Sequence, residues 1–190
     1  ERLPFPLTDG QSEVLREISE DISKPQPMSR LLQGEVGSGK TIVALLAMLQ
    51  AVDNGAQCAL LAPTEVLALQ HARSLTDTLL RAGVPVRVVV LTGSMGSAAK
   101  QDALLKTVSG EADIVVGTHA LIQDGVDFFQ LGLVVVDEQH RFGVEQRDAL
   151  RAKAGETTPH LLVMTATPIP RTIAMTVFGD LAVSTLRELP

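Results

Sequence analysis

Two short segments of the chain carry residue types that together could bind and cleave a nucleoside triphosphate. The first, Gly34-Glu35-Val36-Gly37-Ser38-Gly39-Lys40-Thr41, has the glycines, lysine and hydroxyl of a phosphate-binding loop at the required spacing. Glycines let the backbone turn its N–H groups toward phosphate oxygens, and the following helix presents its positive end to them. We expect Lys40 to reach the β- and γ-phosphates and Thr41 to ligate Mg²⁺. The predicted phosphate-binding residues are Gly34, Gly37, Ser38, Gly39, Lys40 and Thr41.

The second segment is an apolar run, residues 131–136, that ends in Asp137 and Glu138. Strand carboxyl ends are where ligands bind in parallel α/β sheets, and two carboxylates there are costly to desolvate unless a metal or substrate compensates them. Beside a phosphate loop, we expect Asp137 to hold Mg²⁺ through water and Glu138 to accept a proton from the attacking water. Lys40 and Glu138 are thus the predicted catalytic residues. The structural alternative is that these acids cap the next helix.

The hydrophobic pattern predicts the elements that position both segments. Apolar runs alternate with amphipathic stretches, which is typical of a parallel sheet with connecting helices. We predict strands near 29–33, 57–62, 85–91, 113–117, 131–136, 160–165 and 181–186, and helices near 10–22, 40–53, 65–82, 97–108, 143–153 and 170–178. The expected fold is a single α/β domain, residues 1–190, with a mostly parallel sheet and helices on both faces.

Composition limits the classes of protein to which the chain could belong. With five Phe and no Trp or Tyr, the core must be built from Ala, Val, Leu and Ile. The single cysteine, Cys58, excludes an internal disulfide, and its apolar neighbours predict a buried, unreactive thiol. No apolar stretch reaches the roughly 20 residues that cross a bilayer, and no signal peptide opens the chain. The net charge of −6 limits any basic surface to a local one. The chain starts without Met, and we expect it to be part of a larger protein.

Two longer segments carry a resemblance to a known family. Residues 137–147, which begin Asp-Glu-Gln-His, and residues 164–172, which contain Thr165-Ala166-Thr167, resemble superfamily 2 helicases and, within them, the RecG family of DNA helicases. The resemblance implies a RecA-like P-loop domain that uses ATP and Mg²⁺ to remodel branched DNA in the bacterial cytoplasm, without a membrane partner. It covers the first of two motor lobes. The second lobe, which supplies the arginine finger, would follow Pro190, and a DNA-gripping accessory domain would also lie outside this chain.

The resemblance also implies roles for residues outside the two segments. The implied DNA-contacting residues are Pro63, Thr64, Gln70, Thr92, Gly93, Ser94, Thr118 and His119. Contacts of this kind bind one strand through its phosphates and need few Lys or Arg, although a Thr after a strand is also a common helix N-cap. Gln139, His140, Thr165 and Thr167 would couple the nucleotide site to the DNA face. Gln11 would contact adenine, while Thr8 and Gln11 also fit a helix capping box.

Other functions remain as alternatives. A transcription-repair coupling translocase would carry an equivalent lobe. A small-molecule kinase would need an arginine-rich lid, and a GTP-dependent switch would need an Asn-Lys-x-Asp-type guanine reader; we find neither in the sequence. A non-catalytic nucleotide-binding module would not need Lys40, Thr41, Asp137 and Glu138 all intact. We expect the isolated domain to bind ATP·Mg²⁺ weakly and to hydrolyse it very slowly.

Overall fold

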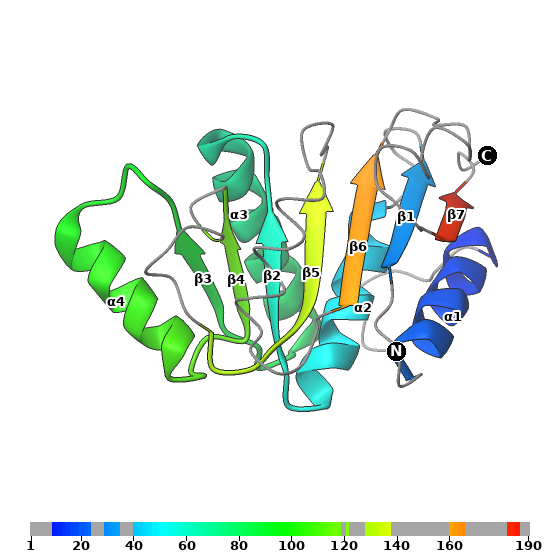
Figure 1. The fold of residues 1–190 in the computed structure, drawn as a ribbon, viewed down its shortest axis with the longest axis horizontal. Coiled ribbons are helices and arrows are strands. Elements are labelled where there is room, and N and C mark those ends of the chain that lie inside the picture. Colours follow the sequence, from blue (N-terminus) through cyan, green and yellow to red (C-terminus); the bar gives the residue numbers. More distant parts are fainter. Residues whose placement is uncertain are drawn as a thin grey trace.

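The fold is a seven-stranded parallel sheet with helices on both faces (Figure 1). The computed structural model describes residues 9–23, 29–34, 40–118, 121, 128–137, 160–165 and 182–186. The elements are α1 (Asp9–Ser23), β1 (Ser29–Gly34), α2 (Lys40–Asp53), β2 (Gln57–Leu61), α3 (Glu65–Ala82), β3 (Val88–Leu91), α4 (Ser97–Val108), β4 (Ile114–Gly117), β5 (Leu131–Asp137), β6 (His160–Thr165) and β7 (Ala182–Leu186). The strand order is β3-β4-β2-β5-β6-β1-β7.

The sequence prediction is confirmed for all seven strands and for four of the helices. Strand β3 begins at Val88, three residues later than expected. Pro85 has no N–H to donate to a neighbouring strand. The N–H of Arg87 donates to the Asp113 carboxylate at 2.9 Å rather than to a backbone carbonyl. The helices expected near 143–153 and 170–178 lie outside the described residues.

The two faces of the sheet bury different helices. On one face, the apolar side chains of α1, α2 and α3 pack on alternate strand residues such as Cys58, Leu60, Leu133 and Val135. On the other face, α4 packs on the intervening strand residues. Apart from Met48, Met164 and Phe128, the large buried side chains that the structure describes in both clusters are aliphatic, so the predicted aliphatic core is confirmed.

A β-bulge at Gly132 determines which side chains of strand β5 lie on each face of the sheet. Gln57 pairs with Leu131, but the next residue of β2, Cys58, pairs with Leu133, so Gly132 is an extra residue on β5. A Cβ at Gly132 would lie 2.5 Å from the Cβ of Ala56, so only glycine fits without a shift. After the bulge, Leu133 and Val135 pack on the face that carries α1, α2 and α3. Because side chains alternate along a strand, Asp137 lies on that same face.

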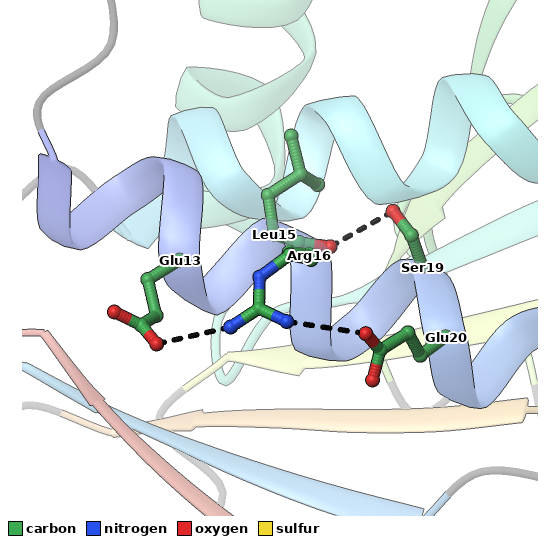
Figure 2. A network of polar contacts seen from close by, with 5 residues as sticks. All are labelled: Glu13, Leu15, Arg16, Ser19 and Glu20. Atoms are coloured by element: carbon green, nitrogen blue, oxygen red, sulfur yellow. Dashed lines mark hydrogen bonds and ion pairs between the residues drawn. The ribbon is translucent and has the colours of Figure 1, made fainter.

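Helix α1 covers the edge of this face with an apolar stripe. Val14 and Ile18 are buried, at 4% and 0% exposure. On the solvent side, the Arg16 guanidinium lies between the carboxylates of Glu13, at 3.1 Å, and Glu20, at 3.2 Å (Figure 2). All three side chains are at least 60% exposed, so these ion pairs contribute little stability. The helix is therefore held mainly by its apolar side.

A polar contact also joins α1 to α2. The Ser19 hydroxyl donates to the carbonyl of Leu15 at 2.8 Å, as Figure 2 shows, and accepts a hydrogen bond from the Gln50 amide at 2.6 Å. Gln50 belongs to the helix that follows the predicted phosphate loop. The contact thus fixes α1, which carries Gln11, against that helix.

Cys58 is buried within the core, as predicted. Its exposure is 0%, and its thiol lies 3.3 Å from the carbonyl oxygen of Met48. Burial, with a smaller effect from the negative charge of Asp113, raises the pKa of the Cys58 thiol far above its usual range. The thiol therefore stays protonated and unreactive in the folded chain. Separately, none of the helices in the described ranges is long and apolar enough to cross a membrane.

Candidate active site

The predicted phosphate loop has the expected strand and helix at its two ends. Strand β1 ends at Gly34, and helix α2 begins at Lys40. The first turn of α2 contains no acidic residue, so its N-terminal partial charge is available to an anion. Thr41 is half-buried in this turn. Gly37, Ser38 and Gly39 lie outside the described residues, as does the side chain of Lys40.

Asp137 ends strand β5, near the strand that leads into this loop. Only β6 separates β5 from β1, so two strand spacings, about 10 Å, separate the two strand ends. Helix α2 contacts β1, β2 and β5, and therefore lies on the face toward which Asp137 points. The fold thus brings Asp137 and Thr41 to the same edge of the sheet. Glu138, Gln139 and His140 lie outside the described residues.

The available donors fit magnesium. Mg²⁺ binds oxygen ligands, commonly one or two carboxylates together with waters and substrate phosphates. Asp137 and Thr41 offer a carboxylate and a hydroxyl, and both are oxygen donors. Both lie at the edge of the sheet where β1 ends and α2 begins, and the remaining ligands of a bound Mg²⁺ would come from water and phosphate.

Asp137 also has a partner that the sequence analysis did not select. The Nε2 atom of His71, on α3, lies 2.6 Å from Oδ2 of Asp137. The two side chains are only 16% and 14% exposed. An ionised carboxylate can only accept, so the His71 Nε2–H donates. One signal was present in the sequence: His71 adjoins the apolar stripe of α3, which includes Ala68, Ala72 and Leu75.

The residues predicted to contact DNA lie after three adjacent strands, β3, β4 and β2. Pro63 and Thr64, after β2, are exposed. The Thr64 hydroxyl accepts a hydrogen bond from the Leu67 N–H at 3.2 Å, with extended backbone at φ −137° and ψ 161°, so Thr64 is the N-cap of α3. Gln70 is exposed on the same helix. The Thr64 hydroxyl therefore caps helix α3, as is common for a Thr after a strand. A hydroxyl at this position still lies at a helix N-terminus, which favours the binding of anions.

The loop after β3 is tied to the start of α3. The Ser94 hydroxyl donates to the carboxylate of Glu65, while Gly93 and Ser94 are themselves exposed. Thr92 is 4% exposed, and its N–H contacts the Met95 sulfur at 3.2 Å. Two of the three loops thus form one connected surface.

The third loop begins at Thr118, which is half-buried directly after β4; His119 lies outside the described residues. Gly117, at the end of β4, packs tightly against β3, because a Cβ there would lie 2.2 Å from the carbonyl oxygen of Leu91. The ends of β3 and β4 are therefore held close together by backbone contact, and the Ala62 N–H, just after β2, donates to the Gly117 carbonyl at 2.8 Å.

The remaining predicted residues lie at other positions of the same sheet edge or on α1. Thr165 is the last residue of β6 and pairs with Gln33 of β1, next to the entry of the phosphate loop. Its side chain and Thr167 lie outside what the structure describes. Gln11 is 4% exposed on α1, which packs against α2 and β7.

Comparison with known proteins places this architecture in a family. The family model for the DEAD/DEAH box helicase matches residues 8–176. The chain is 64% identical to the ATP-dependent DNA helicase RecG of Mycobacterium tuberculosis, covering 100% of the chain and 27% of that protein. It is 55% identical to RecG of Bacillus subtilis, covering 99% and 27%. The chain thus spans about a quarter of the length of these relatives.

Solved helicase structures show the same fold. A structure of RecG bound to a three-way DNA junction superposes with a TM-score of 0.84 and 42% identity, covering 98% of this chain and 24% of that one. The helicase MrfA bound to DNA shares the fold, with a TM-score of 0.73 and 19% identity over 96% of this chain and 27% of that one. The chain therefore belongs to the DEAD/DEAH box helicase family and has the fold of a RecA-like helicase lobe.

Proposed function

We propose that this chain is the ATP-binding motor lobe of a RecG-like helicase that couples ATP hydrolysis to the remodelling of branched DNA. The observation that carries the proposal is the placement of Asp137 at the end of β5, on the face that carries α2, with only β6 between β5 and the strand that leads into the phosphate loop. The high identity to RecG proteins across the whole chain supports DNA as the substrate. The bacterial relatives support a cytoplasmic location.

The proposed nucleotide site assigns each residue a separate task. Backbone N–H groups of Gly34, Gly37, Ser38 and Gly39, with the Lys40 ammonium, bind the phosphates, and Gln11 contacts adenine. Thr41 ligates Mg²⁺, and Asp137 holds it through water. The metal supplies neutralisation of the charge that builds up on the phosphate oxygens. Glu138, one residue beyond Asp137, takes the proton of the attacking water.

The proposed DNA site uses polar groups without base readout. Pro63, Thr64 and Gln70, the loop of Thr92, Gly93 and Ser94, and the loop of Thr118 and His119 offer hydroxyls, amides and a helix N-terminus to the phosphates of one strand. Such contacts position a strand and carry little sequence information. A site built from these groups is compatible with a net charge of −6.

Coupling and the completion of the active site involve both this chain and other parts of the parent protein. Within this chain, Gln139, His140, Thr165 and Thr167 pass the state of the nucleotide to the DNA side. A second RecA-like lobe contributes the arginine finger, which accelerates phosphoryl transfer by roughly 10³–10⁵ where such residues act. An accessory domain grips the branch.

The test compares the isolated domain with the parent protein. We expect the domain to bind a fluorescent ATP analogue weakly and to show almost no turnover, and the parent to hydrolyse ATP faster when forked DNA is added. Robust DNA-stimulated hydrolysis by the domain alone would contradict the need for a second lobe. A parent protein whose hydrolysis ignores DNA would contradict the motor itself.

A further inference from the structure

Helix α3 spans the distance between the two proposed sites. Its N-cap, Thr64, lies at the surface proposed to bind DNA, and His71, about two turns later, contacts Asp137. At 1.5 Å per residue, about 10 Å of rigid helix separates the two residues. The helix is anchored along its length by the buried side chains of Ala68, Ala72, Leu75 and Leu79. A displacement at one end is therefore carried to the other.

The His71–Asp137 contact is short and partly desolvated. Its N···O distance is 2.6 Å, and each side chain is about 15% exposed. A hydrogen bond to a charged group in such surroundings is stronger than one between neutral groups. The contact uses Oδ2 of Asp137, which leaves Oδ1 to accept a hydrogen bond from a metal-bound water. Without this donor, the carboxylate would rotate about its side-chain torsions.

We propose that His71 is a positioning residue for ATP hydrolysis: its Nε2–H orients the Asp137 carboxylate toward the magnesium-bound water and ties that carboxylate to helix α3. The proposal rests on the proposed function, because it needs Asp137 to hold Mg²⁺. It adds a residue outside the phosphate loop and the acidic segment. It also predicts that the loss of His71 weakens binding of the metal–nucleotide complex without weakening binding of the metal-free nucleotide.

The contact could instead serve only the stability of the fold. A purely structural hydrogen bond would change the stability of the domain but would not distinguish nucleotide with Mg²⁺ from nucleotide without it. The comparison of these two affinities is therefore the decisive measurement. Partners that orient metal ligands typically contribute 10- to 100-fold in metal affinity, and a ligand that acts through water belongs at the lower end.

The experiment uses the full parent protein and four variants. In His71→Gln the side-chain amide nitrogen can occupy the place of Nε2, whereas in His71→Asn the amide ends one bond short. His71→Ala removes the donor. Ser74→Ala, an exposed substitution on the same helix, is the matched control. The dissociation constant of fluorescently labelled ADP is measured by titration, once with excess Mg²⁺ and once with EDTA.

We expect the affinity for labelled ADP in excess Mg²⁺ to fall about 10-fold in His71→Ala and His71→Asn. This affinity should be largely restored in His71→Gln and unchanged in Ser74→Ala. In EDTA all five proteins should bind alike. If His71→Ala does not fold, the comparison of His71→Gln with His71→Asn still decides.

Two results would overturn the assignment of His71 alone: affinities in Mg²⁺ that match the control, or a loss that glutamine does not restore. If the unmodified protein binds ADP equally with Mg²⁺ and with EDTA, the proposed magnesium site fails, and the assignment of His71 fails with it. Failure of the inference is thus separable from failure of the proposed function.

Discussion

The two halves of the sheet edge are built on different principles. The ends of β5, β6 and β1 hold the proposed nucleotide site, and the ends of β3, β4 and β2 hold the proposed DNA site. The nucleotide half relies on residue types with few substitutes, such as Lys40 and Asp137. The DNA half relies on hydroxyls and backbone groups, which also cap helices, as Thr64 does.

The difference reflects the charge that each half must balance. A triphosphate with its metal concentrates charge in a small volume, so its site needs a fixed set of charged groups and N–H donors. A DNA strand spreads its charge along an extended chain, and weak polar contacts at several points suffice to position it. We therefore expect substitutions in the nucleotide half to affect chemistry steeply and those in the DNA half to have small, separable effects.

The largest effect is expected at Glu138. Glu138→Gln removes the proton acceptor and should lower ATP turnover of the parent protein by about 10²–10⁴, while ATP binding is kept. Single-turnover hydrolysis with a nucleotide-binding titration measures both. Glu111→Gln, an exposed substitution of the same kind, should turn over like the unmodified protein. Unchanged hydrolysis in Glu138→Gln would remove Glu138 as the base.

In the half of the sheet edge proposed to bind DNA, a large effect on stability is expected only at Gly117, where β4 packs against β3. In Gly117→Ala the new Cβ would lie 2.2 Å from the Leu91 carbonyl oxygen and 2.9 Å from Cγ of Leu121. We expect a loss of about 3 kcal/mol in the free energy of unfolding, measured by urea denaturation. Gly93→Ala, where a Cβ meets nothing within 4 Å, is the control. Equal stability of the two variants would show that the backbones of β3 and β4 can separate without cost.

Thr64 tests whether capping and DNA contact are one role or two. Thr64→Ala removes the acceptor for the Leu67 N–H and should destabilise the domain by about 1 kcal/mol, whereas Thr64→Ser should retain the cap. Urea denaturation gives the stability, and titration of forked DNA at two salt concentrations gives the affinity. If Ala weakens DNA binding but leaves stability unchanged, the hydroxyl serves the DNA and not the helix.

The smallest effect is expected at the contact between Ser94 and Glu65. Ser94 is exposed, so Ser94→Ala should change the free energy of unfolding by less than about 0.5 kcal/mol. It should weaken DNA binding several-fold, because the loop after β3 is no longer tied to α3, and leave ATP affinity without DNA unchanged. A change in that ATP affinity would show that the two halves are not independent in the absence of DNA.

Most of the fold was predictable because its strands are continuous apolar runs that match a sheet buried on both faces. The start of β3 lies three residues later than predicted, because Pro85 has no N–H to donate and the Arg87 N–H donates to the Asp113 carboxylate. The bulge at Gly132 was not predicted either. Glycine in a strand indicates a bulge only in general terms, and the close approach of Ala56 comes from another part of the chain.

The sequence by itself determined the phosphate loop, the acidic pair and the order of the strands along the chain, because these depend on local residue types and spacing. Only the tertiary structure decided that a single strand, β6, lies between β5 and β1, that Asp137 faces α2, and that His71 reaches Asp137 from α3. Such contacts join residues that are distant in the chain, here 66 positions apart, and the packing of helix on sheet alone brings them together.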